Sequence, residues 1–226
     1  MGDWLSYSLA DFLPLSRETY QGLFALYNVR FSPAFAAGLM LGVASLGVVL
    51  RRQATGARIL LAGFGLSWLW IAWAFHLQTL GPLVWAAELF ALLFALQSGL
   101  LLAVALLPLQ LPGPVRPSSP SWLGHAMLAM AVLLYPLAGL AANRNFPGLE
   151  LFGTAPDPTA VATLAVGTLL PKRLALLLIP IPAFWCLVAS LLLHGIASPL
   201  WWLPITAMTL GLVLNWWQHH GGLFLR

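Results

Sequence analysis

Long apolar runs separated by short polar segments dominate this sequence. A helix needs about 20 apolar residues to cross the roughly 30 Å of hydrocarbon in a lipid bilayer. Six runs come close to this length, at residues 33–50, 57–80, 82–107, 122–142, 174–194 and 199–217. A seventh run, at residues 159–170, is shorter and rich in Thr, Ala and Gly, which leaves a short span, a re-entrant segment and a buried interfacial helix as alternatives. The pattern predicts an all-α, polytopic transmembrane bundle of about seven spans, six long and one short.

The composition agrees with lipid as the main solvent. Charged residues make up 7% of the chain and hydrophobic residues 61%, whereas soluble domains carry about 25% charged residues. The ten basic residues are scattered between the apolar runs instead of forming a patch, so nucleic acid is not expected as a partner. Cys186 is the single cysteine, which excludes an internal disulfide and a cysteine zinc site.

The basic residues also predict how the chain is oriented, because cytoplasmic loops collect Lys and Arg. With seven spans, seven basic residues fall on one side and three on the other. The first group is Arg51, Arg52, Arg58, Arg116, Lys172, Arg173 and Arg226, and the second is Arg17, Arg30 and Arg144. This distribution places the N-terminus outside and the C-terminus in the cytoplasm, whereas six spans would segregate the charges less well.

The chain is expected to form one transmembrane domain preceded by an interfacial segment. Residues 1–32 alternate apolar and polar groups and are predicted to be an amphipathic N-terminal segment, with Ser16 as a helix N-cap and Glu18 in the first turn. Residues 33–226 are predicted to be the transmembrane helical domain. The proline-rich stretch at residues 111–120 is the one plausible linker within it.

Glu88 and His76 are ionisable residues inside the predicted spans, where an unpartnered charge is costly. Glu88 is either a proton or cation site or a neutral carboxyl bonded to a neighbouring helix. His76 and Glu88 flank a tight turn at a similar depth, so they are able to form a pair that relays protons. The same geometry fits a simple hydrogen bond between helices.

Further candidate ligand or proton sites lie near the predicted outer surface. The segment at residues 143–159 is the most polar stretch and is expected to be an outer loop. Asp157 or Thr159 would cap the helix that follows, and its positive end would favour a small anion. In a transporter or channel, Asn28 would line an outward-facing vestibule together with His76, Glu88, Asp157 and Thr159.

The histidines include one candidate pair for a metal or a haem, formed by His76 and His194. No His-Glu-x-x-His or Cys-x-x-Cys-His motif accompanies them, so the sequence requires no cofactor. Both residues also fit a simpler role as interfacial histidines.

Small residues, prolines and one amide predict how the helices pack. Gly38 and Gly42 are four residues apart and would let another helix approach closely. Gln97 is expected to bond to a neighbouring helix. Kinks are expected at Pro136, Pro180, Pro182 and Pro204.

Several short motifs resemble those of an uncharacterised family, a domain of unknown function, of small multi-pass bacterial inner-membrane proteins. They are Tyr27-Asn28 with Pro33, Phe75-His76, Gln97, Tyr135-Pro136-Leu137, Phe146-Pro147, Phe152-Gly153 and Pro156-x-Pro158-Thr159. The resemblance covers most of the chain from residue 17 on. It implies bacterial origin, a location in the cytoplasmic (inner) membrane and a compact bundle, but no activity. The chain differs from the family pattern at Asp157, where cysteine is usual, and at Arg144-Asn145, where Gly-His is usual. These differences argue against metal or thiol chemistry there.

Three classes of function fit these features. We favour an accessory or assembly subunit of a larger membrane complex, because the loops are short and the spans carry little charge. Its partners would be the lipid bilayer and other membrane protein subunits. The alternatives are a small-solute or ion transporter or channel with an outward-facing His/Glu cavity, and a haem- or metal-binding membrane redox protein. No catalytic residue is predicted, and enzymatic activity is not favoured.

Overall fold

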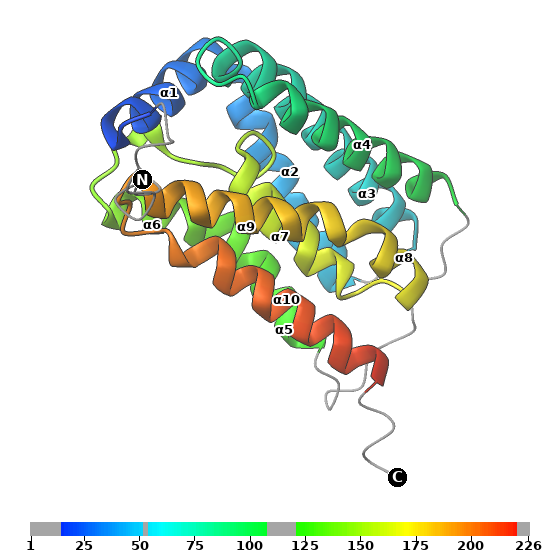
Figure 1. Ribbon diagram of the computed structural model, residues 1–226. Helices are drawn as coiled ribbons and strands as arrows, with labels where there is room; N and C mark the ends of the chain where they lie inside the picture. Colours follow the sequence, from blue (N-terminus) through cyan, green and yellow to red (C-terminus); the bar gives the residue numbers. More distant parts are fainter. Residues whose placement is uncertain (1–14, 52–53, 108–120, 221–226) are drawn as a thin grey trace, which may run out of the picture.

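The computed structural model describes residues 15–51, 54–107 and 121–220 (Figure 1). These residues form helices and connecting loops with no β-strand among them, which confirms the all-α prediction. The α-helices are α1 (Arg17–Arg30), α2 (Ser32–Arg51), α3 (Ala54–Trp70), α4 (Ala87–Leu106), α5 (Ser121–Ala129), α6 (Tyr135–Ala141), α7 (Pro156–Gly167), α8 (Lys172–Leu178), α9 (Pro180–Gly195) and α10 (Trp202–His220). Two π-helical segments, η3 (Ile71–Leu80) and η4 (Met130–Leu134), continue α3 and α5, and η5 (Phe146–Gly148) is a 3₁₀ turn.

Fewer helices are able to cross a membrane than the seven that the apolar runs predict. Among the described residues, three are long and apolar enough, at Gly56–Leu80, Ala87–Leu106 and Trp122–Ala141. The number rises to five if two bent pairs each count as one span, α1 with α2 and α8 with α9. The shortest predicted span fails because α7 has 12 residues, which corresponds to about 18 Å of helix.

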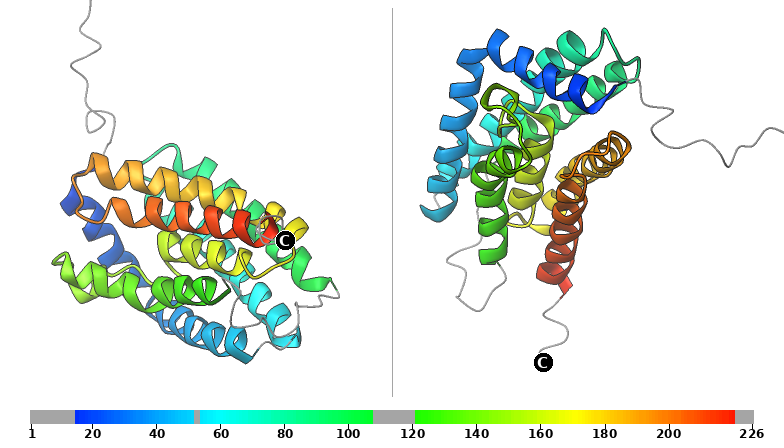
Figure 2. Two further views of the ribbon diagram at one scale, coloured as in Figure 1. Left: turned by 90° about the horizontal axis from the view of Figure 1, so that it is seen from below. Right: turned by 90° about the vertical axis from the view of Figure 1, so that its left-hand side faces the viewer.

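Helix α1 lies across one end of the bundle, which we call the α1 end (Figure 2). It meets α2 at 93°. The predicted cap is confirmed, because the Thr19 N–H donates to Ser16 Oγ at 3.2 Å. One face of α1 is buried, with Tyr20, Phe24, Tyr27 and Asn28. The first 14 residues of the predicted interfacial segment, and the predicted linker at 111–120, lie outside the described residues.

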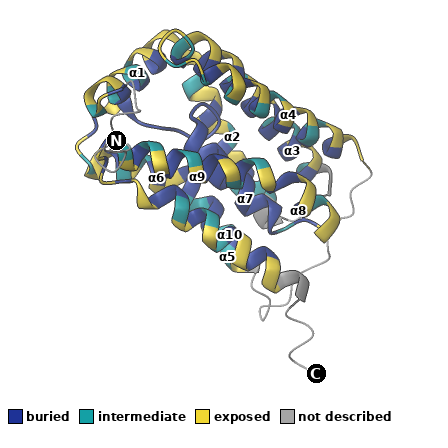
Figure 3. Cartoon of the chain, in the orientation of Figure 1, coloured by how far each residue is buried: buried dark blue, intermediate teal, exposed yellow. Residues whose placement is uncertain are grey.

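Helix α7 lies in the interior of the bundle, and every one of its residues is buried (Figure 3). It is packed by α3, α5, α8, α9, α10 and η4. Its Ala, Thr, Val and Gly side chains are small, so the surrounding helices are able to approach it closely. The short apolar run is therefore a core helix of the bundle.

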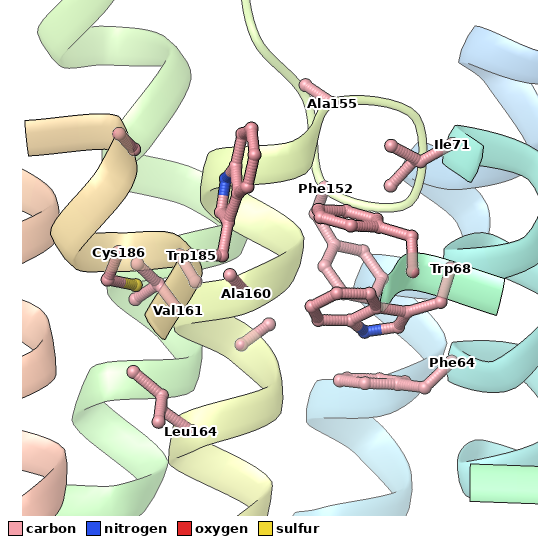
Figure 4. Close-up of a cluster of buried hydrophobic side chains, with 14 of the residues drawn as sticks. Phe64, Trp68, Ile71, Phe152, Ala155, Ala160, Val161, Leu164, Trp185 and Cys186 are labelled. Atoms are coloured by element: carbon pink, nitrogen blue, oxygen red, sulfur yellow. The ribbon is translucent and has the colours of Figure 1, made fainter. Parts of the chain in front are cut away.

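Aromatic side chains surround α7 on two sides (Figure 4). Phe64 and Trp68 of α3 lie on one side, and Trp185 of α9 lies on the other. The indole N–H of Trp68 donates to Thr163 Oγ1 of α7 at 2.9 Å. Both indoles contact Phe94 of α4, with ring centroids 4.3 Å from Trp68 and 5.0 Å from Trp185. These contacts join α3, α4, α7 and α9 into one core.

The glycines of α2 allow a close approach, as predicted: a helical segment, η4, approaches Gly42, whereas a loop approaches Gly38. A Cβ atom at Gly38 would lie 2.7 Å from the Phe152 carbonyl oxygen, and one at Gly42 would lie 2.9 Å from Val132 Cγ1. Gly153, next to Phe152, has a φ of 83°, which other residues rarely adopt. Glycine is therefore needed on both sides of this contact.

The prolines at the α8–α9 junction open the backbone there. The two helices bend by 40° at this junction. Pro182 has no N–H to donate to the Leu178 carbonyl four residues earlier. Gln97 of α4 supplies the missing bond, since its Nε2 donates to Leu178 O at 3.0 Å. The predicted bond from Gln97 to a neighbouring helix is confirmed.

Candidate functional site

The polar segment between α6 and α7 is largely buried, in contrast to the outer loop that its composition suggests. Arg144 is 6% exposed and Glu150 2%. Their side chains form an ion pair with each other. Buried charges are tolerated in pairs, so this internal pairing explains why a polar segment folds into the bundle at the α1 end.

Several hydrogen bonds fasten this segment in place. Asn28 Nδ2 donates to Pro147 O at 2.6 Å and to Leu149 O at 2.9 Å. Thr159 Oγ1 accepts from the Gly153 N–H at 2.9 Å and donates to Ala155 O at 2.7 Å. Asn28 and Thr159 were candidates for a ligand site, and the structure gives both of them backbone partners instead.

Replacing Asn28 with alanine is expected to lower the free energy of unfolding by about 1–3 kcal/mol, because the buried Leu149 carbonyl and the partly buried Pro147 carbonyl lose their donor. Thermal unfolding of purified protein in a mild detergent measures the effect. Gln78→Ala is the control, since Gln78 is exposed on η3. Equal midpoints for the two variants would contradict the fastening role of Asn28.

Asp157 is at the N-terminal end of α7, but it does not cap the helix. The N-cap is Ala155, which has no capping side chain. Pro156 begins the helix because its fixed φ and missing N–H suit the first helical position. The prediction that Asp157 or Thr159 caps α7 is therefore wrong. Since Pro156 and Pro158 have no N–H and the Ala155 N–H bonds to Leu151 O, few free amides remain there for an anion.

The Asp157 carboxyl is completely buried and points into the bundle. Its Oδ2 accepts from Tyr135 Oη at 3.2 Å, and its Oδ1 accepts from Trp185 Nε1 at 2.9 Å. Both donors are neutral. The carboxyl thus connects α7 to α6 and α9 through two neutral donors.

Asp157 belongs to a buried group of ionisable residues that we call the acidic cluster: Tyr20, Tyr135, Arg144, Glu150 and Asp157. Electrostatic interactions link both tyrosines to both carboxyls, and the Arg144 guanidinium lies 5.9 Å from the centre of the Tyr20 ring. Burial opposes the charge of Arg144, but the neighbouring Glu150 carboxylate outweighs it and raises the pKa of the guanidinium above its ordinary value. With both carboxyls ionised, the acidic cluster has one positive and two negative charges.

His76 lies beside the acidic cluster in an aromatic environment. It is 0% exposed, and neither ring nitrogen has a hydrogen-bond partner. Its ring contacts Phe94 at a centroid distance of 4.5 Å and Trp185 at 5.1 Å. Trp185 therefore lies between the two polar groups, because its N–H binds Asp157 and its ring contacts His76.

Both π-helical segments help to place this site. His76 is within η3, and Tyr135 directly follows η4. In η3, Thr79 Oγ1 donates to Ala74 O at 2.7 Å, a bond that spans five residues. π-Helical turns are rare and occur frequently at functional sites. Their position here marks His76 and Tyr135 as residues whose orientation departs from that of a regular α-helix.

Two other predicted candidates are apart from this site. Glu88 is exposed on α4 and does not pair with His76, because Ala87 and Ala91 face the interior and Glu88 points away from it. His194 is exposed near the end of α9, where its ring contacts Trp201 at 5.2 Å. It follows Trp185 by nine residues, or about 13 Å of helix, so it cannot share a ligand with His76. Within the described residues, no group of three His, Cys, Asp or Glu side chains is placed to hold a metal.

Sequence reasoning missed Trp185, Tyr135 and the Arg144–Glu150 pair as parts of the site. Two signals were available. Trp185 is in the middle of an apolar run and not at its end, where tryptophan anchors usually lie. Arg144 and Glu150 are opposite charges six residues apart in a chain that has few charges.

The structure defines a class of protein: a helical bundle with several helices apolar enough to cross a membrane and a buried polar site. The chain belongs to a family of unknown function (DUF6064), which matches residues 17–221. This match confirms the predicted membership of an uncharacterised family. No curated protein and no solved structure matches the chain.

Proposed function

We propose that the protein is a multi-pass protein of the bacterial cytoplasmic membrane that carries protons, or a small cation in their place, through the site around Asp157. The observation that carries this proposal is the charge of the acidic cluster. One guanidinium faces two carboxyls in it, and that guanidinium is bonded to Glu150. Asp157 therefore needs a second positive charge.

The energetic argument rests on the burial of Asp157. Removing an ionised carboxylate from water costs several kcal/mol, and only a nearby cation or several donors compensate. Asp157 has two neutral donors and is 0% exposed. Either a proton or a bound cation must neutralise the excess charge. Ionisable groups inside membrane bundles commonly mark ion or proton pathways for this reason.

The accessory-subunit function remains the second candidate. It is supported by the hydrogen bonds of Asn28 and Thr159, which make a rigid bundle in which two of the candidate residues have structural roles. An accessory subunit does not need an excess negative charge in its interior, however. For that reason the acidic cluster favours transport. Native-size analysis of the protein extracted in mild detergent tests the accessory function, which predicts co-purification with a larger complex.

Proton transport is tested with the purified protein in proteoliposomes that contain a pH-sensitive dye. A proton gradient is expected to dissipate faster than in protein-free liposomes, and Asp157→Asn is expected to abolish the difference because the amide does not titrate. Glu88→Gln is the matched control, since it neutralises an exposed carboxyl outside the site. Parallel measurements with Na⁺ and K⁺ gradients identify a cation that replaces the proton.

Two results would overturn the transport proposal. One is wild-type flux of H⁺, Na⁺ and K⁺ equal to that of protein-free liposomes. The other is undiminished flux in Asp157→Asn. Monodisperse elution of each variant in detergent shows that a lost flux does not come from misfolding.

A further inference from the structure

We infer that His76 and Gln97 form a second buried site that binds water and continues the polar route from Asp157 deeper into the bundle. The site lies between η3, α4 and the α8–α9 junction. Three polar atoms there have no hydrogen-bond partner: Nδ1 and Nε2 of His76 and Oε1 of Gln97. Both side chains are 0% exposed.

Both side chains are related through Phe94 of α4. Phe94 contacts the His76 ring at 4.5 Å, and Gln97 follows Phe94 by one helical turn on the buried face of α4. Gln97 is held there by the bond from its Nε2 to Leu178 O. This bond leaves its carbonyl oxygen as the free group.

Burial of polar atoms without partners is costly, at about 1–3 kcal/mol for each group. Native proteins satisfy such atoms with buried water, which typically makes about three hydrogen bonds. A neutral imidazole has one donor and one acceptor, and the Gln97 oxygen is an acceptor. Two or more water molecules match this set, because the two ring nitrogens point in different directions: one water accepts from the imidazole N–H, and another donates to the other ring nitrogen or to the Gln97 oxygen.

A metal ion fits the same place poorly. The other groups around His76 are the rings of Phe75, Phe90, Phe94 and Trp185. None of these rings supplies an anionic ligand, and Gln97 offers one neutral oxygen. The chemistry of the site is that of hydrogen-bonded water.

The role of this water site rests on the proposed transport function. Trp185 contacts both sites, through its N–H to Asp157 and through its ring to His76. Gln97 lies further from the α1 end than Phe94, since α4 runs away from that end. The water at His76 and Gln97 would therefore be the next polar group beyond the Trp185 indole for a proton released by Asp157.

X-ray footprinting of the full-length protein in detergent tests the site directly. Hydroxyl radicals formed from bound water oxidise adjacent side chains that bulk solvent does not reach. Phe94 is expected to be oxidised several-fold faster than Phe64, although the two rings are equally buried, at 1% and 0% exposure. The Phe64 ring packs on Phe152 at 4.8 Å, away from the unpartnered atoms.

The double variant His76→Leu/Gln97→Leu removes the three unpartnered atoms and is expected to reduce oxidation of Phe94 to the rate of Phe64. Equal rates for the two phenylalanines in the wild-type protein would overturn the water site, and this comparison needs no variant to fold. The outcome is separable from transport. Fast oxidation of Phe94 without any flux would overturn the transport function and leave the water site standing. Flux with slow oxidation of Phe94 would overturn the water site and leave the transport function standing.

Discussion

Replacing Arg144 with methionine is expected to lower the free energy of unfolding by about 3–5 kcal/mol, because it leaves a buried carboxylate without its partner. Glu150 is 2% exposed, and its second carboxyl oxygen already lacks a hydrogen bond. Asp157 lies in the same cluster, so the variant also removes the positive charge that both carboxyls experience. The effect is measured by thermal or denaturant unfolding in a mild detergent.

The double variant Arg144→Met/Glu150→Leu is the informative companion. Replacing both members of a buried ion pair with apolar residues is often neutral or stabilising, so it is expected to recover most of the loss. Arg30→Met is the control for loss of a positive charge, because Arg30 is exposed at the end of α1. A single Arg144→Met variant as stable as Arg30→Met would show that the pair is not buried.

Replacing Gly38 with leucine is expected to cost about 3 kcal/mol or more, since the new side chain collides with backbone that has no room to move. The Phe152 carbonyl oxygen lies 2.7 Å from the position of a Cβ atom at Gly38. Gly153, the next residue, has a left-handed φ of 83° and is close to the Gly38 Cα. The loop that contains Phe152 cannot move away from α2 without losing the left-handed turn at Gly153.

Gly47→Leu is a matched control on the same helix. No atom lies within 4 Å of a Cβ at Gly47, and leucine favours the helical conformation more than glycine by up to about 1 kcal/mol. This variant is therefore expected to be as stable as the wild type or more so. The two variants are compared by their unfolding midpoints in the same detergent, and a similar loss in both would contradict the close contact between α2 and the loop.

The sequence predicted the helical architecture but not the depth of each segment. Apolar length marks α3 with η3 and α4 as candidate spans, because hydropathy measures the solvent that a helix prefers. It does not distinguish a short span from a core helix, since both are apolar. The 12-residue α7 is buried by helices that come from distant parts of the chain. The hydropathy of its own residues does not predict this burial.

The site was predicted in part for similar reasons. His76 was singled out from the sequence as a polar residue in an apolar run, and the structure buries its side chain completely. Its pairing with Glu88 assumed regular α-helical geometry on both sides of the turn, whereas η3 is π-helical. The partners of Asp157 come from α6 and α9, 22 and 28 residues away. Contacts over such separations depend on tertiary packing, which a single sequence does not reveal.

The complete enclosure of α7 determines when it is able to settle during synthesis. Three of the segments that pack on it, α3, α5 and η4, precede it in the chain, and the other three, α8, α9 and α10, are made after it. Until the ribosome has finished α10, α7 has one side without a partner. In a chain truncated after α8, α7 should therefore be accessible to protease. The last two helices, α9 and α10, complete the burial of α7.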